Sequence, residues 1–456
     1  MRRKSKNKTL LAKAREALVE YRIFWVFLLI ALCFGGGGRG ANIANLIVQI
    51  AALVMVALNL DHIRNGWSRI GWGAKAVLIA TLALPLVQLI PLPPVLWTQL
   101  PGREILVEAH EVTMGQPGWA PISLVPGVTL LALTGLIAPL VVFLVGASMR
   151  KTSTQLALAV LVAAALLCTA IGAMQLLSGG SLQFYETGDP GYLHGLFANH
   201  NSTGLFLVIA LCALIELAFA SRLRPAILAV AAALGFALAV AVILTQSRSS
   251  LALMLMPLAL VAFHIVARTK FGGNRILGIA ATGAIVLAGV GVAALAITSN
   301  ERMAQTIERF DTTANLRPAL WADARSSAER FFPVGSGMGT FDEVFQLDES
   351  LETLYPARAG RAHNDYLEIL IEAGVVGVLV LFSWVAYAGL GILRSGGSQI
   401  PSRAFYIAVA GCFAAQSLID YPLRNQALLC VAALIMGMLA GSRANGRTRE
   451  KELPGV

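Results

Sequence analysis

Charged side chains are scarce in this sequence, and their scarcity decides its class. Lysine, arginine, aspartate and glutamate make up 13% of the 456 residues, whereas a soluble domain carries about a quarter. Hydrophobic residues make up 57%, and the mean hydropathy is +0.72. Apolar runs of roughly 18 or more residues recur, each long enough to cross about 30 Å of hydrocarbon. The composition therefore excludes a soluble globular protein and predicts an all-α polytopic membrane protein.

Cysteine is also rare, and no cluster of residues has metal-ligand spacing. The five cysteines all fall inside apolar runs: Cys33, Cys168, Cys212, Cys412 and Cys430. This excludes a disulfide framework and favours small buried or lipid-facing side chains. His200 and His363 could in principle share a metal, but no second carboxylate–histidine cluster accompanies them. We therefore predict no metal and no cofactor.

Hydropathy predicts twelve membrane spans, with boundaries good to a few residues. They cover residues 18–35, 42–60, 75–92, 129–148, 155–178, 202–220, 226–244, 251–267, 276–297, 366–393, 404–419 and 426–441. The predicted organisation is a basic N-terminus at 1–17, spans at 18–297, a large outer loop at 298–365, the last three spans at 366–441 and a tail at 442–456. The first run lacks a clear small-residue cleavage site, so we interpret it as a span and not as a signal peptide.

The distribution of basic residues predicts the orientation. With the N-terminus inside, 24 of the 35 lysine and arginine residues, including all the lysines, fall on the inner side. The positive-inside rule therefore places both termini in the cytoplasm. The basic residues are scattered, so nucleic-acid binding is not predicted. Every outer basic residue is arginine, whose planar fork suits phosphate and carboxylate, although a compositional bias toward arginine gives the same pattern.

Three outer segments are long, at residues 93–128, 179–201 and 298–365, and long loops often carry function. In the third, "NLRPALWADARSSAERFF" has Pro318 near a helix start and apolar residues at helical spacing. This pattern predicts an amphipathic helix lying on the membrane or on the bundle. The following "PVGSGMGTF" lacks the strand and Gly-Lys-Ser/Thr of a nucleotide loop, so we interpret it as a turn.

The next segment, "GRAHNDYLEILIEAGVVG" from Gly360, places charged residues at the edge of a span, where they are costly and often functional. Asp365 followed by Glu368 resembles a capping box and predicts a helix beginning near Asp365. His363 then lies beside the helix N-terminus, whose field favours anions and a neutral imidazole, as a general base requires. Alternatively, His363 and Asn364 merely cap and anchor the helix. Gly374 and Gly377 permit close helix contact inside the span.

Two other outer sites hold candidate residues. "TQSRSS" places Arg248 in a very short turn, where it either snorkels to the membrane surface or binds an anion. "GYLHGLFANHNSTG" contains Tyr192, His194, Asn199, His200 and Asn201, and its composition predicts a tight turn and a helix cap. In "DYPLRN", near the C-terminus, we expect Asp420 and Arg424 to pair with each other and hold the turn.

These motifs together resemble the O-antigen ligase and O-antigen polymerase superfamily. The resemblance spans roughly residues 190–425 and depends on the order and spacing of several short elements. They are a Gly-x-Phe-x-Asn-x-Asn turn from Gly195, "SRSS" on a short outer turn, an Arg-x-x-x-Trp element at Arg317 and a His-Asn…Gly-x-x-Gly run from His363. A large outer loop precedes the last of these elements, as in the superfamily.

The resemblance implies a GT-C-like glycosyltransferase in the bacterial inner membrane that needs neither metal nor nucleotide. The donor is a glycan on undecaprenyl diphosphate, and the acceptor is a glycan or lipid A–core. By this resemblance Arg248 and Arg317 hold the diphosphate, and His363 is the base or positions the acceptor. One departure is Tyr192, where many members have arginine. His194, Arg361 or Arg358 then contributes to the anion site, with Asn199, Asn201 and Asn364 as further substrate-binding candidates.

The alternatives differ in acceptor and in class. A polymerase that extends an O-antigen or exopolysaccharide shares donor and motifs with a ligase, and transfer to protein hydroxyls is a third variant. A transporter or lipid flippase is the alternative of another class, because a twelve-span bundle is common there. That alternative predicts inverted repeats and ionisable residues near mid-membrane. The main interior candidates are Glu216 and His264, whereas the other charged candidate sites cluster on the outer face.

Overall fold

The computed structural model describes residues 10–38, 41–185, 191–220, 225–268, 316–351, 358–395 and 401–451. The described chain is mostly helical, as predicted. The only β-structure in it is a two-residue antiparallel ladder, β1 (Pro91–Leu92) with β2 (Ala120–Pro121). The ladder closes the base of the segment that carries the short helices α6 (Pro94–Trp97) and α7 (Glu104–Met114).

The N-terminal half contributes long apolar helices and two sharp bends. Its remaining helices are α1 (Leu10–Glu20), α2 (Arg22–Phe34), α3 (Asn42–Leu58), α4 (Leu60–Arg69), α5 (Trp72–Gln88), α8 (Pro126–Gly135), α9 (Ile137–Ser148), α10 (Lys151–Leu177) and α11 (His200–Ala220). The chain turns by 72° between α1 and α2 and by 85° between α3 and α4. A hydropathy pattern does not detect such bends, because it depends on the composition of a segment and not on the direction of the helix axis.

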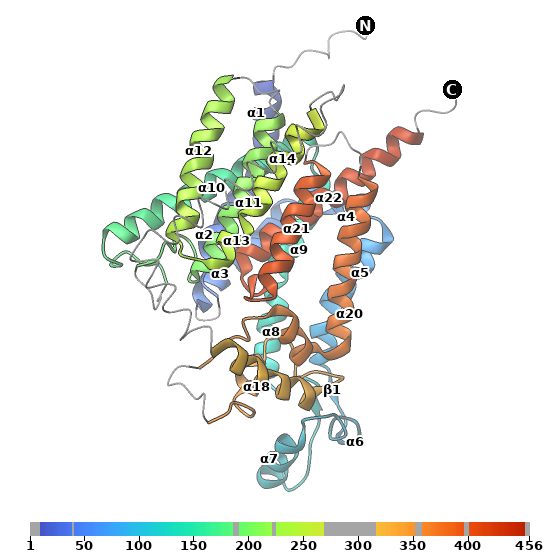
Figure 1. Cartoon of the computed structure of the whole chain (residues 1–456). Helices are drawn as coiled ribbons and strands as arrows, with labels where there is room; N and C mark the ends of the chain where they lie inside the picture. The colour runs from blue at the N-terminus through green and yellow to red at the C-terminus, as the bar shows by residue number, and fades with distance from the viewer. Residues whose placement is uncertain are drawn as a thin grey trace.

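The C-terminal half completes the bundle and covers one end of it. Its elements are α12 (Pro225–Leu244), α13 (Arg248–Leu253), α14 (Leu255–Arg268), α18 (Leu316–Phe331), α19 (Phe341–Phe345), α20 (Asp365–Arg394), α21 (Arg403–Ser417), the 3-10 turn η1 (Pro422–Arg424) and α22 (Gln426–Lys451). Figure 1 places α1 and the last turns of α22 at one end of the bundle, and α7 and α18 at the opposite end.

In the described residues, six helices are long and apolar enough to cross a membrane, or eight if each bent pair forms one span. The twelve predicted spans are therefore not confirmed. The eleventh corresponds to α21, which has only 15 residues. The third and twelfth correspond to the short apolar helices Trp72–Gln88 and Gln426–Ser442. The ninth, at residues 276–297, lies outside the described residues.

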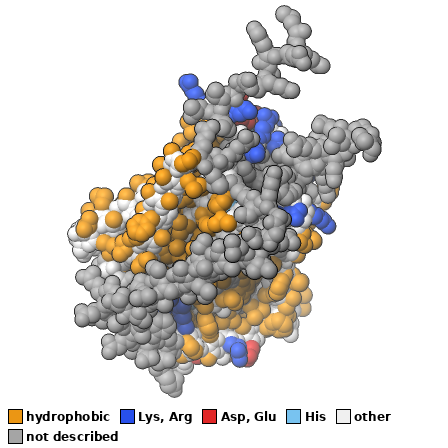
Figure 2. Space-filling model, turned by 45° about the horizontal axis from the view of Figure 1, so that its top comes forward, with side chains coloured by type: hydrophobic (Ala, Val, Ile, Leu, Met, Phe, Trp, Pro, Cys, Tyr) orange, Lys and Arg blue, Asp and Glu red, His pale blue; other side chains and the backbone are white. Residues whose placement is uncertain are grey.

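Two hydrophobic cores hold the helices together. The main core joins α2, α3, α9, α10, α11, α21 and α22 through buried apolar side chains. A smaller core fixes α18 against α19 and the first turns of α20, through Ala324, Ala328, Phe331, Phe341 and Ile371. The amphipathic helix predicted from Pro318 is therefore confirmed, and it lies on the bundle. Hydrophobic side chains dominate the described part of the face in Figure 2, with few charged side chains among them, as expected for a surface in lipid.

Candidate functional site

The candidate site is built around the start of α20, where the chain enters the helix through a strained residue. The helix begins at Asp365, as predicted, but its N-cap is Asn364, whose side chain accepts a hydrogen bond from the backbone of Leu367. Glu368 reaches back and accepts from the backbone N–H of Ala362 at 3.2 Å. His363 has φ 47°, a left-handed conformation that is uncommon for a residue with a side chain.

The imidazole of His363 faces a buried carboxylate. Its Nδ1 lies 3.3 Å from Oδ1 of Asp420, with side-chain exposures of 31% and 3% respectively. A carboxylate in this position favours the tautomer with hydrogen on Nδ1 and leaves Nε2 as the basic atom. The expected pairing of Asp420 with Arg424 is wrong, because the η1 turn directs these two side chains to different partners.

Asp420 is held from a third segment. Nδ2 of Asn199 lies 3.3 Å from Oδ2 of Asp420 and 3.2 Å from the hydroxyl of Tyr421. Burial alone would raise the pKa of Asp420, but the hydrogen bond with His363 and the positive charges of His363 and Arg317 lower it overall. Asp420 is therefore ionised at neutral pH and stabilises positive charge on His363.

Two arginines interact electrostatically with each other, and one of them also with this pair. Arg317, in the first turn of α18, acts electrostatically on both Asp420 and Arg248. Arg248 is the first residue of α13, whose N-cap Ser247 accepts a hydrogen bond from the backbone of Ser250. In the described part of the chain Arg317 makes no ion pair with a carboxylate within 4 Å. Guanidinium groups are well suited to bind phosphate and carboxylate groups.

The segment before α11 completes the wall beside Arg248. The rings of Tyr192 and His200 are 4.8 Å apart, and those of His194 and His200 are 6.1 Å apart. Tyr192 also interacts electrostatically with Arg248. Nδ1 of His200 lies 2.9 Å from the carbonyl oxygen of Thr245. The predicted tight turn is therefore present, and it packs against the turn that carries Arg248.

Asn201 strengthens the same connection. Its side-chain oxygen accepts a hydrogen bond from the hydroxyl of Ser247 at 2.7 Å. Asn199 Oδ1 accepts from the backbone N–H of Asn201 at 2.8 Å. Asn201 therefore connects α11 to the turn that carries Arg248, and Asn199 connects the start of α11 to Asp420.

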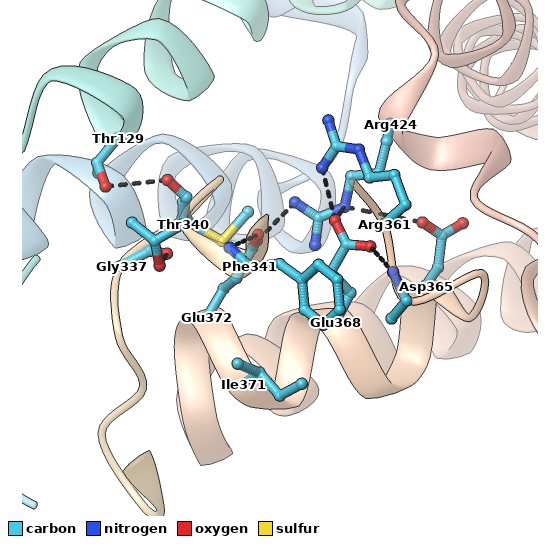
Figure 3. A network of polar contacts seen from close by, with 12 residues as sticks. Thr129, Gly337, Thr340, Phe341, Arg361, Asp365, Glu368, Ile371, Glu372 and Arg424 are labelled. Carbon is cyan, nitrogen blue, oxygen red and sulfur yellow. Dashed lines mark hydrogen bonds and ion pairs between the residues drawn. The ribbon is translucent and has the colours of Figure 1, made fainter. Parts of the chain in front are cut away.

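A second group of charged residues, which the sequence did not predict as a unit, gathers around the first turns of α20 (Figure 3). Nη1 of Arg424 binds Glu372 at 2.6 Å, and its Nε lies 3.4 Å from Glu368 and 3.7 Å from Asp365. Arg361 binds Glu368 at 2.6 Å. The three carboxylates are fully buried, so they depend on the two guanidinium groups for compensation. We call these five residues the charge network.

Arg361, which the sequence suggested for the anion site, belongs to the charge network. Its guanidinium already faces Glu368. Arg358, the other arginine proposed in place of Tyr192, is 67% exposed and lies 3.8 Å from Asp342. Of the arginines that the sequence suggested, Arg317 is the one that acts electrostatically on Asp420.

The glycine-rich turn at 333–341 joins the charge network from the side, as the residues labelled in Figure 3 show. Oε1 of Glu372 accepts from the backbone of Phe341, and its backbone oxygen accepts from Gly337. Gly374 breaks the helical geometry of α20 with φ 54°, and the backbone of Val375 donates to Pro333. A Cβ on Gly374 would overlap the Pro333 carbonyl. The expected helix contact at Gly374 is therefore wrong, because a loop fills this space.

Further polar side chains tie this turn to the bundle. The Gln88 amide donates to the Glu372 carbonyl and accepts from the Met338 backbone, both at 2.9 Å. Arg103 is buried and donates to the carbonyl oxygens of Pro101, Ile122 and Gly335. Burial lowers the pKa of Arg103 to about 10. In the described residues, no group of three or more histidine, cysteine, aspartate or glutamate side chains is arranged to hold a metal ion.

Fold and site together define a polytopic helical membrane protein with a polar, histidine- and arginine-bearing site at one end of the bundle. The family model for O-antigen ligase matches residues 233–382. This match supports membership of the chain in the O-antigen ligase superfamily, as the sequence motifs predicted. The matched residues include Arg248, Arg317 and His363, but Asp420 and the segment before α11 lie outside them. No curated protein matches the chain.

Proposed function

We propose that this protein is a glycosyltransferase that moves a glycan from undecaprenyl diphosphate to an acceptor hydroxyl, such as one on lipid A–core. The observation that carries the proposal is the His363–Asp420 pair, 3.3 Å apart and within electrostatic reach of Arg317. It combines a base with its orienting carboxylate and a cation for an anionic leaving group. Two of these three residues lie in the O-antigen ligase match.

In the proposed reaction, His363 Nε2 takes the proton of the acceptor hydroxyl. The hydroxyl oxygen then forms a bond to the anomeric carbon of the donor sugar. The bond from that carbon to the diphosphate oxygen breaks, and its electron pair leaves with undecaprenyl diphosphate. Asp420 stabilises the imidazolium that forms. General base catalysis of this kind contributes about 10²–10⁴ in rate.

Arg317 and Arg248 are proposed to bind the diphosphate. Negative charge grows on the leaving oxygen, and fixed donors in a poorly hydrated site stabilise it without reorganisation. Two guanidinium groups supply this charge, so the proposed step uses neither a metal ion nor a nucleotide. The flanking Tyr192 and His194 are proposed to contact the donor.

Asn199, Asn201, Asn364 and Arg361 receive a different proposed role. Each side chain already binds a protein group: Asp420, Ser247, the α20 backbone and Glu368 respectively. We assign them to positioning the site and not to direct contact with substrate.

The proposed setting is the bacterial inner membrane, with the α18 end of the bundle facing the periplasm. Both termini are then cytoplasmic, as the lysine distribution favours. The division into a large periplasmic loop at 298–365 between spans at 18–297 and 366–441 belongs to the same proposal. Lipid substrates reach a site at the end of the bundle from the surrounding bilayer.

The experiment is the glycolipid profile of a deletion strain complemented with the wild type, His363→Ala or His110→Ala. His110 lies on α7 and accepts a hydrogen bond from Gly118, so it is a matched control. We expect lost surface glycan, rescue by the wild type and His110→Ala, and no rescue by His363→Ala. Long unattached lipid-linked chains in the deletion strain indicate a ligase, and single repeat units indicate a polymerase. An unchanged profile on deletion contradicts the proposal and favours the transport alternative.

A further inference from the structure

A long apolar cavity of about 370 Å³ lies between α20 and the helices α5, α9, α21 and α22. Its walls are almost entirely aliphatic and aromatic. A hydrogen bond joins two of its walls, because Nε1 of Trp384 on α20 donates to the hydroxyl of Thr81 on α5 at 2.9 Å. Both of these residues line the cavity. This space belongs to the membrane-spanning part of the bundle, where the surrounding solvent is hydrocarbon.

The cavity is long and narrow. Beyond the break at Gly374, α20 lines it from Gly377 to Ile392, and at 1.5 Å per residue these positions are about 22 Å apart along the helix. One leaflet of the bilayer supplies only about 15 Å of hydrocarbon, half of the whole core. A volume of about 370 Å³ spread over this length suits one chain. The several acyl chains of a lipid A-type acceptor do not fit side by side.

The polar end of the cavity adjoins the candidate site. Tyr366, Ser417 and Arg424 line this end. Ser417 and Arg424 flank the turn that presents Asp420 to His363. Arg424 is already bound by Glu372 and lies close to Glu368 and Asp365, so this end is not a diphosphate site. A chain in the cavity would place its head beside the turn that carries Asp420.

We propose that this cavity holds the isoprenoid chain of the polyprenyl diphosphate donor. The inference rests on the proposed function for the identity of the donor. The cavity admits one long hydrocarbon chain. The protein therefore distinguishes the donor lipid, which has one chain, from an acceptor lipid that has several. A chain that moves from bilayer to cavity exchanges one apolar environment for another. Binding therefore depends on packing and shape, and a side chain that fills the cavity should block it.

The test is photolabelling of the protein in nanodiscs with undecaprenyl phosphate that carries a diazirine in its chain. Ala388→Trp fills the cavity from α20. Ala386→Trp is the matched control, because Ala386 is exposed on the same helix and does not line the cavity. Ala410→Phe fills the cavity from α21 and provides a second obstruction if Ala388→Trp does not fold. Labelled peptides are mapped by mass spectrometry, with unlabelled undecaprenyl phosphate or a diacyl phospholipid as competitor.

We expect label on the cavity face of α20 and α21, displaced by undecaprenyl phosphate and not by the phospholipid. Labelling should fall at least about tenfold in Ala388→Trp and Ala410→Phe and stay unchanged in Ala386→Trp. Label elsewhere, displacement by the phospholipid, or full labelling of both filled variants overturns the proposal. Labelling needs no turnover, so the two proposals fail separately. Cavity labelling without glycan transfer refutes only the enzyme, and transfer with label elsewhere refutes only the cavity.

Discussion

Asp420 holds His363 from across the site: Oδ1 of Asp420 lies 3.3 Å from Nδ1 of His363, and the carboxylate is itself fixed by Asn199. The contact joins the segment before α20, the turn after α21 and the segment before α11. One carboxylate therefore orients the proposed base and connects the three parts of the chain that form the site.

Removing the charge of Asp420 tests its orienting role. Asp420→Asn keeps the shape but no longer favours hydrogen on Nδ1 or stabilises the imidazolium. We expect transfer to fall by about 10²–10⁴ with normal membrane insertion. Asp348→Asn is the control, because Asp348 pairs with the partly exposed Arg330. Glycan transfer by purified protein is the measurement, and an equal effect of both substitutions would count against the orienting role.

The same carboxylate predicts how stability depends on pH. The pKa of Asp420 in the folded protein is below its usual 3.8. A lowered folded-state pKa stabilises the fold above the unfolded-state pKa, and this stabilisation is lost as the pH falls through the folded value. Wild type should therefore melt at a higher temperature than Asp420→Asn at pH 7. The difference should shrink below about pH 4, and a difference that grows on acidification would contradict the assignment.

The geometry of Arg317 can be separated from its charge. Arg317→Lys keeps the positive charge but loses the planar fork, so we expect transfer to fall by about 10²–10³. Arg325→Lys is the control, because Arg325 is exposed on the same helix. Rates are measured at matched protein levels in membranes. Full activity of Arg317→Lys would make Arg317 a structural residue.

Gly374 is expected to be required for the fold. Its positive φ and its closeness to the Pro333 carbonyl both oppose a Cβ. Gly374→Ala should cost about 1–3 kcal/mol for the backbone strain, and more for the overlap. Gly389→Ala, at an open position of the same helix, should be neutral or slightly stabilising. Thermal unfolding in detergent distinguishes them, and similar melting temperatures would mean that α20 tolerates a regular helix at Gly374.

The charge network predicts a contrast between buried and surface ion pairs. Arg424→Leu leaves buried carboxylates without their main counter-charge and should destabilise the fold by about 3–5 kcal/mol. Arg330→Ala removes a pair whose arginine is 38% exposed and should cost at most about 1 kcal/mol. Chemical denaturation provides both values. Comparable costs would show that Arg424 is not essential to the network.

Local signals in the sequence predicted part of this site. The His-Asn motif, the cap near Asp365 and the amphipathic helix at Pro318 were recognisable because each depends on a few adjacent residues. The partners of Asp420 and Arg424 were not. Sequence proximity favoured pairing them with each other, whereas the η1 turn directs one to His363 and the other to Glu372. The break at Gly374 was not predicted either, because the apolar composition of α20 continues on both sides of it.

The measurement that tests the account most directly is the release of undecaprenyl diphosphate from a purified lipid-linked glycan donor by the protein in nanodiscs. Wild type and His363→Ala are compared with an acceptor present. We predict one undecaprenyl diphosphate released for each glycan transferred by wild type. His363→Ala should be slower by about 10²–10⁴ when the two are compared at equal amounts of folded protein. Transfer at the wild-type rate by His363→Ala would contradict the central claim that the His363–Asp420 pair activates the acceptor.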